Sequence, residues 1–178
     1  DGDLFKSIRR GDAEIVTDRI KTFTEKGLLL ESGKELEADI IVTATGLDLI
    51  PIGNVKFAID GEDVVVSDTM VYKGMMVGGA PNFAFTVGYT NASWTLKADL
   101  VADYVCRTLN YMDEHGYNKC VPEPDPSVEP EPLLDFPAGY VLRAIDRFPK
   151  AGSKKPWRLS MTYLQDFFAM KHGDVNDG

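Results

Sequence analysis

The run ADIIVTATG, at residues 38–46, constrains the fold of this chain more than any other feature. Ile40, Ile41 and Val42 are consecutive β-branched apolar residues, so the run lacks the alternation of a strand with one face in water. It predicts a buried strand in a sheet that helices cover on both faces, and hence an α/β fold. Because Gly46 has no Cβ, the main chain can pass close to a neighbouring segment or a ligand there.

Two further strand-like runs, AEIVTDRIKTFTE and GLLLES, precede this one. Turn residues at Lys26-Gly27 and Ser32-Gly33 separate the three, which predicts a small antiparallel meander. Ile15, Ile20 and Phe23 are its expected core contacts. Further on, VKFAID and GEDVVV predict a hairpin about Asp60-Gly61.

The stretch NFAFTVGYTNASW predicts a strand, a tight turn and a helix. The strand ends at Gly88, and Asn91 or Ser93 can cap the helix, which ends near Gly116. A helix N-terminus presents free backbone N–H groups, which suit a phosphate or the edge of a ring. The same arrangement also occurs in α/β proteins that bind no ligand. The apolar positions of the helix keep a period of 3.6 residues: Leu96, Leu100, Val101, Tyr104, Val105 and Leu109.

Charge and composition exclude several function classes. The net charge of -9 over 178 residues repels nucleic acid and anionic membrane surfaces. No apolar stretch approaches the roughly 20 residues that span a bilayer, so we expect a cytoplasmic protein without membrane contact. Cys106 and Cys120 are expected to be free thiols, and no metal site is expected.

Two long stretches resemble the C-terminal part of flavin-containing and Baeyer-Villiger monooxygenases. They are GLLLESGKELEADIIVTATGLDL and YKGMMVGGAPNFAFTVGYTNASWTLKADLVADYVCR, and GYVLRAIDRFPKAGSKKPWRLSMTYLQDF is similar to the tail of a bacterial branch. The resemblance implies pieces of two interleaved Rossmann-like domains. Residues 1–48 would end the NADPH-binding domain, with a β-meander and the ATG strand, and residues 49–120 would be the C-terminal part of the FAD-binding domain. A Pro/Glu-rich linker (121–138) and a helical tail (139–178) would follow.

The resemblance also implies a site and an activity. Thr45 and Gly46 would lie near the flavin or its nucleotide, at the crossing between the domains. Five residues of the second motif would face the flavin ring: Gly88, Tyr89, Thr90, Asn91 and Ser93. The parent enzyme would use FAD, NADPH and O₂ to oxygenate a small organic substrate through a flavin peroxide. No residue is assigned as catalytic.

The glycine fingerprint G-x-G-x-x-G, which binds dinucleotide phosphates, occurs nowhere in the sequence. We therefore expect a C-terminal fragment that is inactive alone, and the start without Met agrees with this. Strands that lack their partners predict self-association, as a dimer. Two alternatives are an NAD(P)H-flavin oxidoreductase of the disulfide-reductase type and a non-catalytic binding or assembly module.

Overall fold

The computed structural model describes residues 2–177 and divides into two compact units, one ending at Thr45 and one beginning at Gly46. Both are built from short elements, and the fold is mixed α/β with small antiparallel sheets. This confirms the α/β class. No helix among residues 2–177 combines the length and the apolar character needed to cross a membrane.

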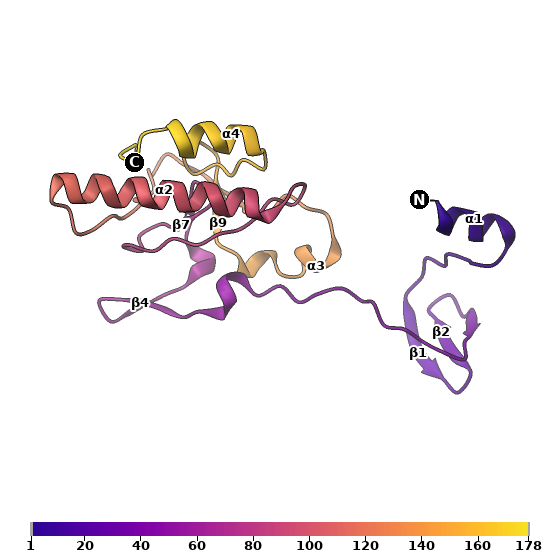
Figure 1. Cartoon of the computed structure of the whole chain (residues 1–178). Helices are drawn as coiled ribbons and strands as arrows, with labels where there is room; N and C mark the ends of the chain where they lie inside the picture. The colour runs from indigo at the N-terminus through magenta and orange to yellow at the C-terminus, as the bar shows by residue number, and fades with distance from the viewer. Residues whose placement is uncertain (1, 178) are drawn as a thin grey trace. The chain divides into compact units, whose positions relative to one another are not determined.

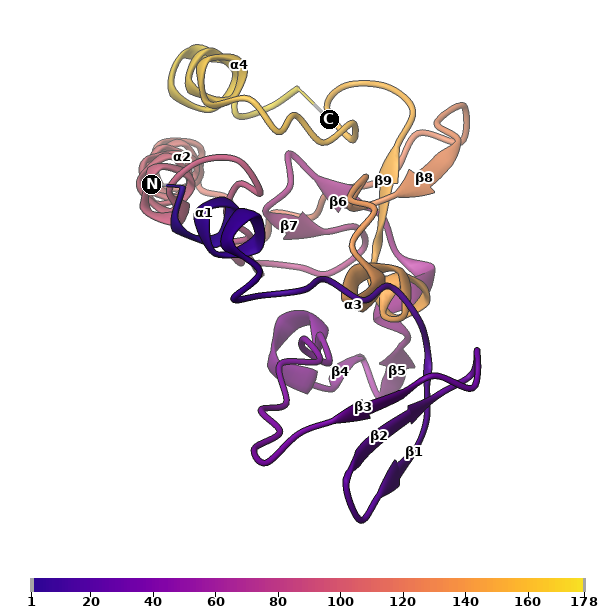
Figure 2. The same ribbon diagram turned by 90° about the vertical axis from the view of Figure 1, so that its right-hand side faces the viewer.

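The first unit consists of a helix and an antiparallel meander, whose third strand lies at residues 35–37 and not at the predicted residues 38–46. Helix α1 (Asp3–Arg10) is followed by β1 (Ile20–Thr24), β2 (Gly27–Leu30) and β3 (Glu35–Glu37), which pair antiparallel in that order (Figure 2). The prediction that Ile15, Ile20 and Phe23 form a core is wrong, because all three are exposed. A single three-stranded layer of this size leaves one face without cover.

The predicted buried strand at residues 38–46 does not form. These residues have no regular structure, and the side chains of Ile40 and Val42 are 82% and 83% exposed. A strand made to be covered needs neighbours on its edges and faces, and none of the strands within residues 2–177 pairs with this run. Residues 82–89 likewise form one isolated bridge, between Met76 and Ala84, instead of a strand.

Helix α2 (Trp94–His115) is the main element of the second unit. It follows Ser93 and ends at Gly116, whose φ of 70° is left-handed, so both predicted ends are confirmed. Three of the predicted apolar positions are buried (Leu100, Val101 and Tyr104), and Val105 packs beside them, whereas Leu96 and Leu109 are exposed.

Two short strand pairs lie beside each other in the second unit (Figure 2). Strand β6 (Val71–Tyr72) pairs with β7 (Met76–Val77), and β8 (Pro130–Pro132) pairs with β9 (Lys150–Gly152). Strand β8 lies within residues 121–138, the segment that sequence analysis expects to be a linker. The backbone of residues 130–132 hydrogen-bonds to that of residues 150–152, and local composition does not predict a pairing between such distant segments.

The hairpin before α2 and the helices of the tail form where the sequence predicts a hairpin and a helical tail. Strands β4 (Phe57–Ile59) and β5 (Glu62–Val64) form the predicted hairpin, and the short helices η1 (Pro51–Asn54) and η2 (Val66–Asp68) flank it. The tail contains α3 (Gly139–Leu142), η3 (Ile145–Arg147), α4 (Tyr163–Phe167) and the π-helix η4 (Phe168–His172). Helix α4 lies along α2 (Figure 1), and Trp157 and Met170 complete the core around Tyr104.

Candidate functional site

Gly88 begins the turn that leads into α2, and it is buried. A Cβ added there would lie 2.1 Å from Cγ of Trp94 and 2.7 Å from its Cβ. Only glycine therefore lets the indole ring of Trp94 lie against the backbone of the turn. The group that lies against the backbone at Gly88 is therefore a side chain of the same chain.

The N-terminus of α2 has no side-chain cap. The Ser93 side chain makes no hydrogen bond to the helix backbone, and its hydroxyl instead lies 2.8 Å from the Thr95 hydroxyl. Thr90, Asn91 and Ser93 are all exposed. The first N–H groups of the helix thus lack the partner that a capping residue usually supplies, and an electronegative group can bind them.

Tyr89 lies in the core beneath this turn. Its hydroxyl donates a hydrogen bond of 2.8 Å to Oδ2 of Asp166, and Nζ of Lys97 donates to the same oxygen, also at 2.8 Å. Both charged residues are buried: Lys97 is 2% exposed and Asp166 is 6% exposed. Burial, together with the adjacent carboxylate, raises the pKa of Tyr89 above its usual range, so its phenol stays a donor.

Thr45 and Gly46 are exposed, at the point where the two units divide. Gly46 has a left-handed φ of 92°, and a Cβ there would meet the Cβ of Tyr140 in α3 at 3.6 Å. Asp48 accepts hydrogen bonds from the Arg147 guanidinium, which hold the pKa of that carboxyl below its ordinary value. Residues 46–48 are therefore held on α3 and η3, whereas the turn at Gly88 is held by α2 and α4.

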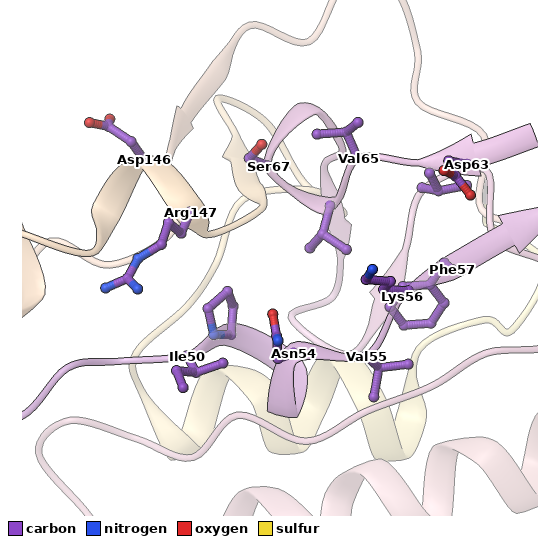
Figure 3. A pocket seen from close by; sticks show the side chains of 13 residues that line it. Ile50, Asn54, Val55, Lys56, Phe57, Asp63, Val65, Ser67, Asp146 and Arg147 are labelled. Carbon is purple, nitrogen blue, oxygen red and sulfur yellow. The ribbon is translucent and has the colours of Figure 1, made fainter.

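A cavity of about 640 Å³ lies beside Arg147 (Figure 3). Ile50 and Asn54 lie on one side of it, and Val65 and Ser67 on the other. Its volume is in the range of small-molecule sites, and its walls combine apolar groups with both signs of charge. The lining residues of opposite charge are Lys56, Asp63, Asp146 and Arg147. Sequence analysis did not predict this cavity.

Similarity to known proteins covers the whole chain. It is 55% identical over 177 residues to the FAD-containing monooxygenase EthA of Mycobacterium tuberculosis, which is 99% of this chain and 36% of that protein. It is also 50% identical over 177 residues to EthA of Mycolicibacterium smegmatis, with the same two coverages. The probable FAD-binding monooxygenase AlmA of Acinetobacter baylyi is 47% identical over 180 residues, 100% of this chain and 36% of that protein.

This chain is homologous to FAD-containing monooxygenases. It spans about 36% of the length of these curated relatives and matches their C-terminal part, so the resemblance seen in the sequence is confirmed. No family model and no solved structure matches the chain.

The exposed start of α2 can bind an electronegative group. It offers backbone donors, the hydroxyls of Thr90 and Ser93 and the amide of Asn91. The side chain of Tyr89 points to Asp166 and not outward, so a role for Tyr89 would be to hold the turn. Contacts of Thr45, Gly46 and these turn residues with a cofactor stay predictions.

Lys97 and Asp166 are the buried polar residues that sequence analysis missed. One signal was available, because Lys97 precedes Leu100, Val101 and Tyr104 at the spacing of the same helix face. A lysine on an apolar face requires a buried acid as its partner. Asp166 is 69 residues away, so the sequence could indicate the need for an acid but not which one.

Proposed function

We propose that this chain forms the part of an FAD- and NADPH-dependent monooxygenase that contacts the flavin, in an enzyme that uses O₂ to oxygenate a small organic substrate. The uncapped N-terminus of α2 after the buried Gly88, in a chain whose relatives are named FAD-containing monooxygenases, carries the proposal. The names of the relatives also favour this function over that of a plain flavin oxidoreductase.

Each residue of the turn has a role in this proposal. The N–H groups at the start of α2, with Asn91 and Ser93, bind the electronegative edge of the flavin ring. A helix N-terminus stabilises negative charge by about 0.3–1 kcal/mol at an exposed site and by more when it is partly buried. Gly88 allows Trp94 to pack, and Tyr89 anchors the turn to Asp166. These residues would hold a flavin, which would supply the redox chemistry between NADPH and O₂.

The domain assignment extends the proposal to the whole chain. Residues 1–48 would belong to the NADPH-binding domain and residues 49–120 to an interleaved, Rossmann-like FAD-binding domain, with Thr45 and Gly46 near the cofactor at the crossing. The left-handed backbone of Gly46 supports a sharp change of direction there. A cytoplasmic location and a dimer complete the proposal, with the exposed Ile40 and Val42 as the surface that self-associates.

Two measurements test this function. The isolated chain should purify without stoichiometric visible flavin absorbance, because it has no phosphate-binding glycine loop of the G-x-G-x-x-G type. Joined to both glycine-fingerprint strands of a homologous monooxygenase, it should bind FAD and support NADPH oxidation that depends on substrate. Failure of that complete protein to bind FAD would refute the proposal.

Substitutions in the complete protein locate the contact. Asn91→Ala combined with Ser93→Ala should lower FAD occupancy, because both polar groups of the turn are lost. Asn110→Ala is the matched control, an exposed asparagine on the far half of α2, and should leave occupancy unchanged. Equal occupancy in both variants would remove the turn from the flavin site.

A further inference from the structure

Two side chains, Tyr72 and Lys73, contact the carboxylate of Asp177, and Tyr104 contacts both of them. Nζ of Lys73 lies 2.9 Å from Oδ2 of Asp177 and 3.1 Å from the Tyr104 hydroxyl. The Tyr72 hydroxyl donates to Oδ1 of Asp177 and lies 3.1 Å from the Tyr104 hydroxyl. We call Tyr72, Lys73 and Tyr104 the carboxylate cage.

The cage is a buried, positively charged site. The Lys73 side chain is 7% exposed, and its ammonium lies 4.6 Å from the ring centre of Tyr104 and 5.2 Å from that of Tyr72. Its other polar partner is the backbone oxygen of Asp174, at 3.2 Å. A buried ammonium is costly unless an anion pairs with it. The cage therefore favours an occupant that carries a negative charge.

A cavity of about 330 Å³ with a mixed, mainly aromatic and apolar lining adjoins the cage and shares Tyr72 and Tyr104 with it. Val175 and Asn176 form part of its wall, and Val175 packs against the hydrophobic core. The segment Val175–Asp177 thus presents an apolar group to the cavity and a carboxylate to the cage. Most other lining residues are aromatic or apolar: Met76, Tyr111, Met112, Tyr117, Cys120, Val121 and Pro122.

The segment that fills the cage is held by few contacts. Residues 173–177 have no helix or strand. Besides the cage, Arg107 holds the start of this segment through the carbonyls of Met170 and Gly173, at 2.6 Å each. Segments with little buried apolar surface open at a low free-energy cost. The Asp177 carboxylate can therefore leave the cage while α2 and η4 stay packed.

We propose that the carboxylate cage and the adjoining cavity form a binding site for a small carboxylic acid with an apolar body, which Val175–Asp177 occupies in cis. The acid would place its carboxylate on Lys73 and Tyr72 and its hydrocarbon body among the aromatic side chains. Binding requires the segment to leave, so the segment lowers the affinity for the acid by competition. This site is separate from the turn at Gly88 and does not depend on the proposed flavin chemistry.

Hexanoate is the probe, titrated into the Asp177→Ala variant at constant ionic strength and followed by calorimetry. We expect saturable binding at least roughly tenfold tighter than to the unsubstituted chain, because the competing carboxylate is gone. Hexanamide, which has the same body without the charge, should bind neither protein. Absence of saturable hexanoate binding to a folded Asp177→Ala variant would overturn the proposal.

Two variants separate the cage from a general charge effect. Asp174→Ala removes an equal charge from the same segment. Within residues 2–177 the Asp174 carboxylate accepts only from the Asn176 backbone N–H, at 3.0 Å, so this variant should bind hexanoate like the unsubstituted chain. Asp177→Ala combined with Lys73→Met should lose binding. Retained binding in that double variant would contradict the proposed site.

The unsubstituted chain gives an independent test should Asp177→Ala fail to fold. Saturating hexanoate should displace Val175 from the aromatic cavity, and its methyl NMR signals should move toward the positions of a solvent-exposed valine. Hexanamide serves as the control at equal concentration. Methyl signals that do not move under saturating hexanoate would show that the segment is a fixed part of the core and would overturn the proposal.

Discussion

The Nζ atom of Lys97 lies 2.8 Å from Oδ2 of Asp166, and this contact joins α2 to α4 inside the core. The same carboxylate oxygen accepts from Tyr89, the second residue of the turn before α2. A helix from the tail thus fixes the segment that we propose to contact the flavin.

Lys97→Met should destabilise the chain by about 3–5 kcal/mol in urea unfolding, because it leaves the Asp166 carboxylate buried without its cation. Lys171→Met is the matched control, since Lys171 pairs with Asp103 at 3.1 Å on the surface. It should cost no more than about 1 kcal/mol. The double variant Lys97→Met with Asp166→Leu should recover much of the loss, and a double variant as unstable as the single one would contradict this account.

Gly88→Ala should displace the ring of Trp94 and cost about 1–3 kcal/mol, as overpacking does. Tryptophan fluorescence and urea unfolding measure the two effects. Gly2→Ala is the control, because a Cβ there has no heavy atom within 4 Å. Adding Trp94→Ala to Gly88→Ala should relieve the clash, and an unchanged stability of Gly88→Ala alone would show that the turn has room.

Tyr72 should ionise only when the chain unfolds in alkali. Burial, followed by hydrogen bonding to Asp177, raises the pKa of Tyr72 above its ordinary value of 10.0. Because the folded state binds this proton more tightly, the stabilisation is complete below pH 10 and is lost as the pH rises above it. Ultraviolet titration of the seven tyrosines should show a late, cooperative step, which Tyr72→Phe makes smaller. A smooth titration of all seven would contradict this.

Asp48→Asn should remove a pH-dependent stabilisation of the folded chain, which requires the ionised carboxylate of Asp48. The Arg147 guanidinium lowers the pKa of Asp48 below its ordinary value of 3.8, so the stabilisation is present above that pH and is lost as the pH falls below it. The difference in unfolding free energy between the unsubstituted chain and the variant should therefore be constant near neutrality and shrink below pH 3.8. A difference that does not change with pH would mean that the pair does not form in solution.

Ile40→Lys combined with Val42→Lys should abolish self-association of the chain. Both side chains are exposed, and lysine on an unpaired apolar segment opposes edge-to-edge contact. Light scattering at micromolar concentration measures the mass. Leu4→Lys replaces another exposed apolar residue, on α1, and should leave the mass unchanged. An unsubstituted chain that is already monomeric would contradict the proposed dimer.

Sequence patterns predicted the elements whose stability is local. Helix α2 has its own periodicity and terminal glycine, and the β4–β5 hairpin has its Asp-Gly turn, so both appear where expected. The run at residues 38–46 did not form a strand, because a strand needs a partner and its composition cannot supply one.

The candidate sites were less predictable than the helices. The turn at Gly88 was found through glycine and a capping pattern, which are local signals. Tyr72 of the carboxylate cage and its occupant Asp177 are 105 residues apart, and no spacing rule relates such distant positions. Asp166 was hidden for the same reason, because it lies 69 residues from its partner Lys97.

Recombination among relatives is restricted by the contact between α2 and α4. The segment at residues 121–138 is rich in Pro and Glu and would look like a natural place to exchange tails between homologous enzymes. An exchange there would part Lys97 from Asp166, which lie on opposite sides of the junction. Functional chimeras should therefore inherit the lysine and its acid from the same parent, or from parents that both have them.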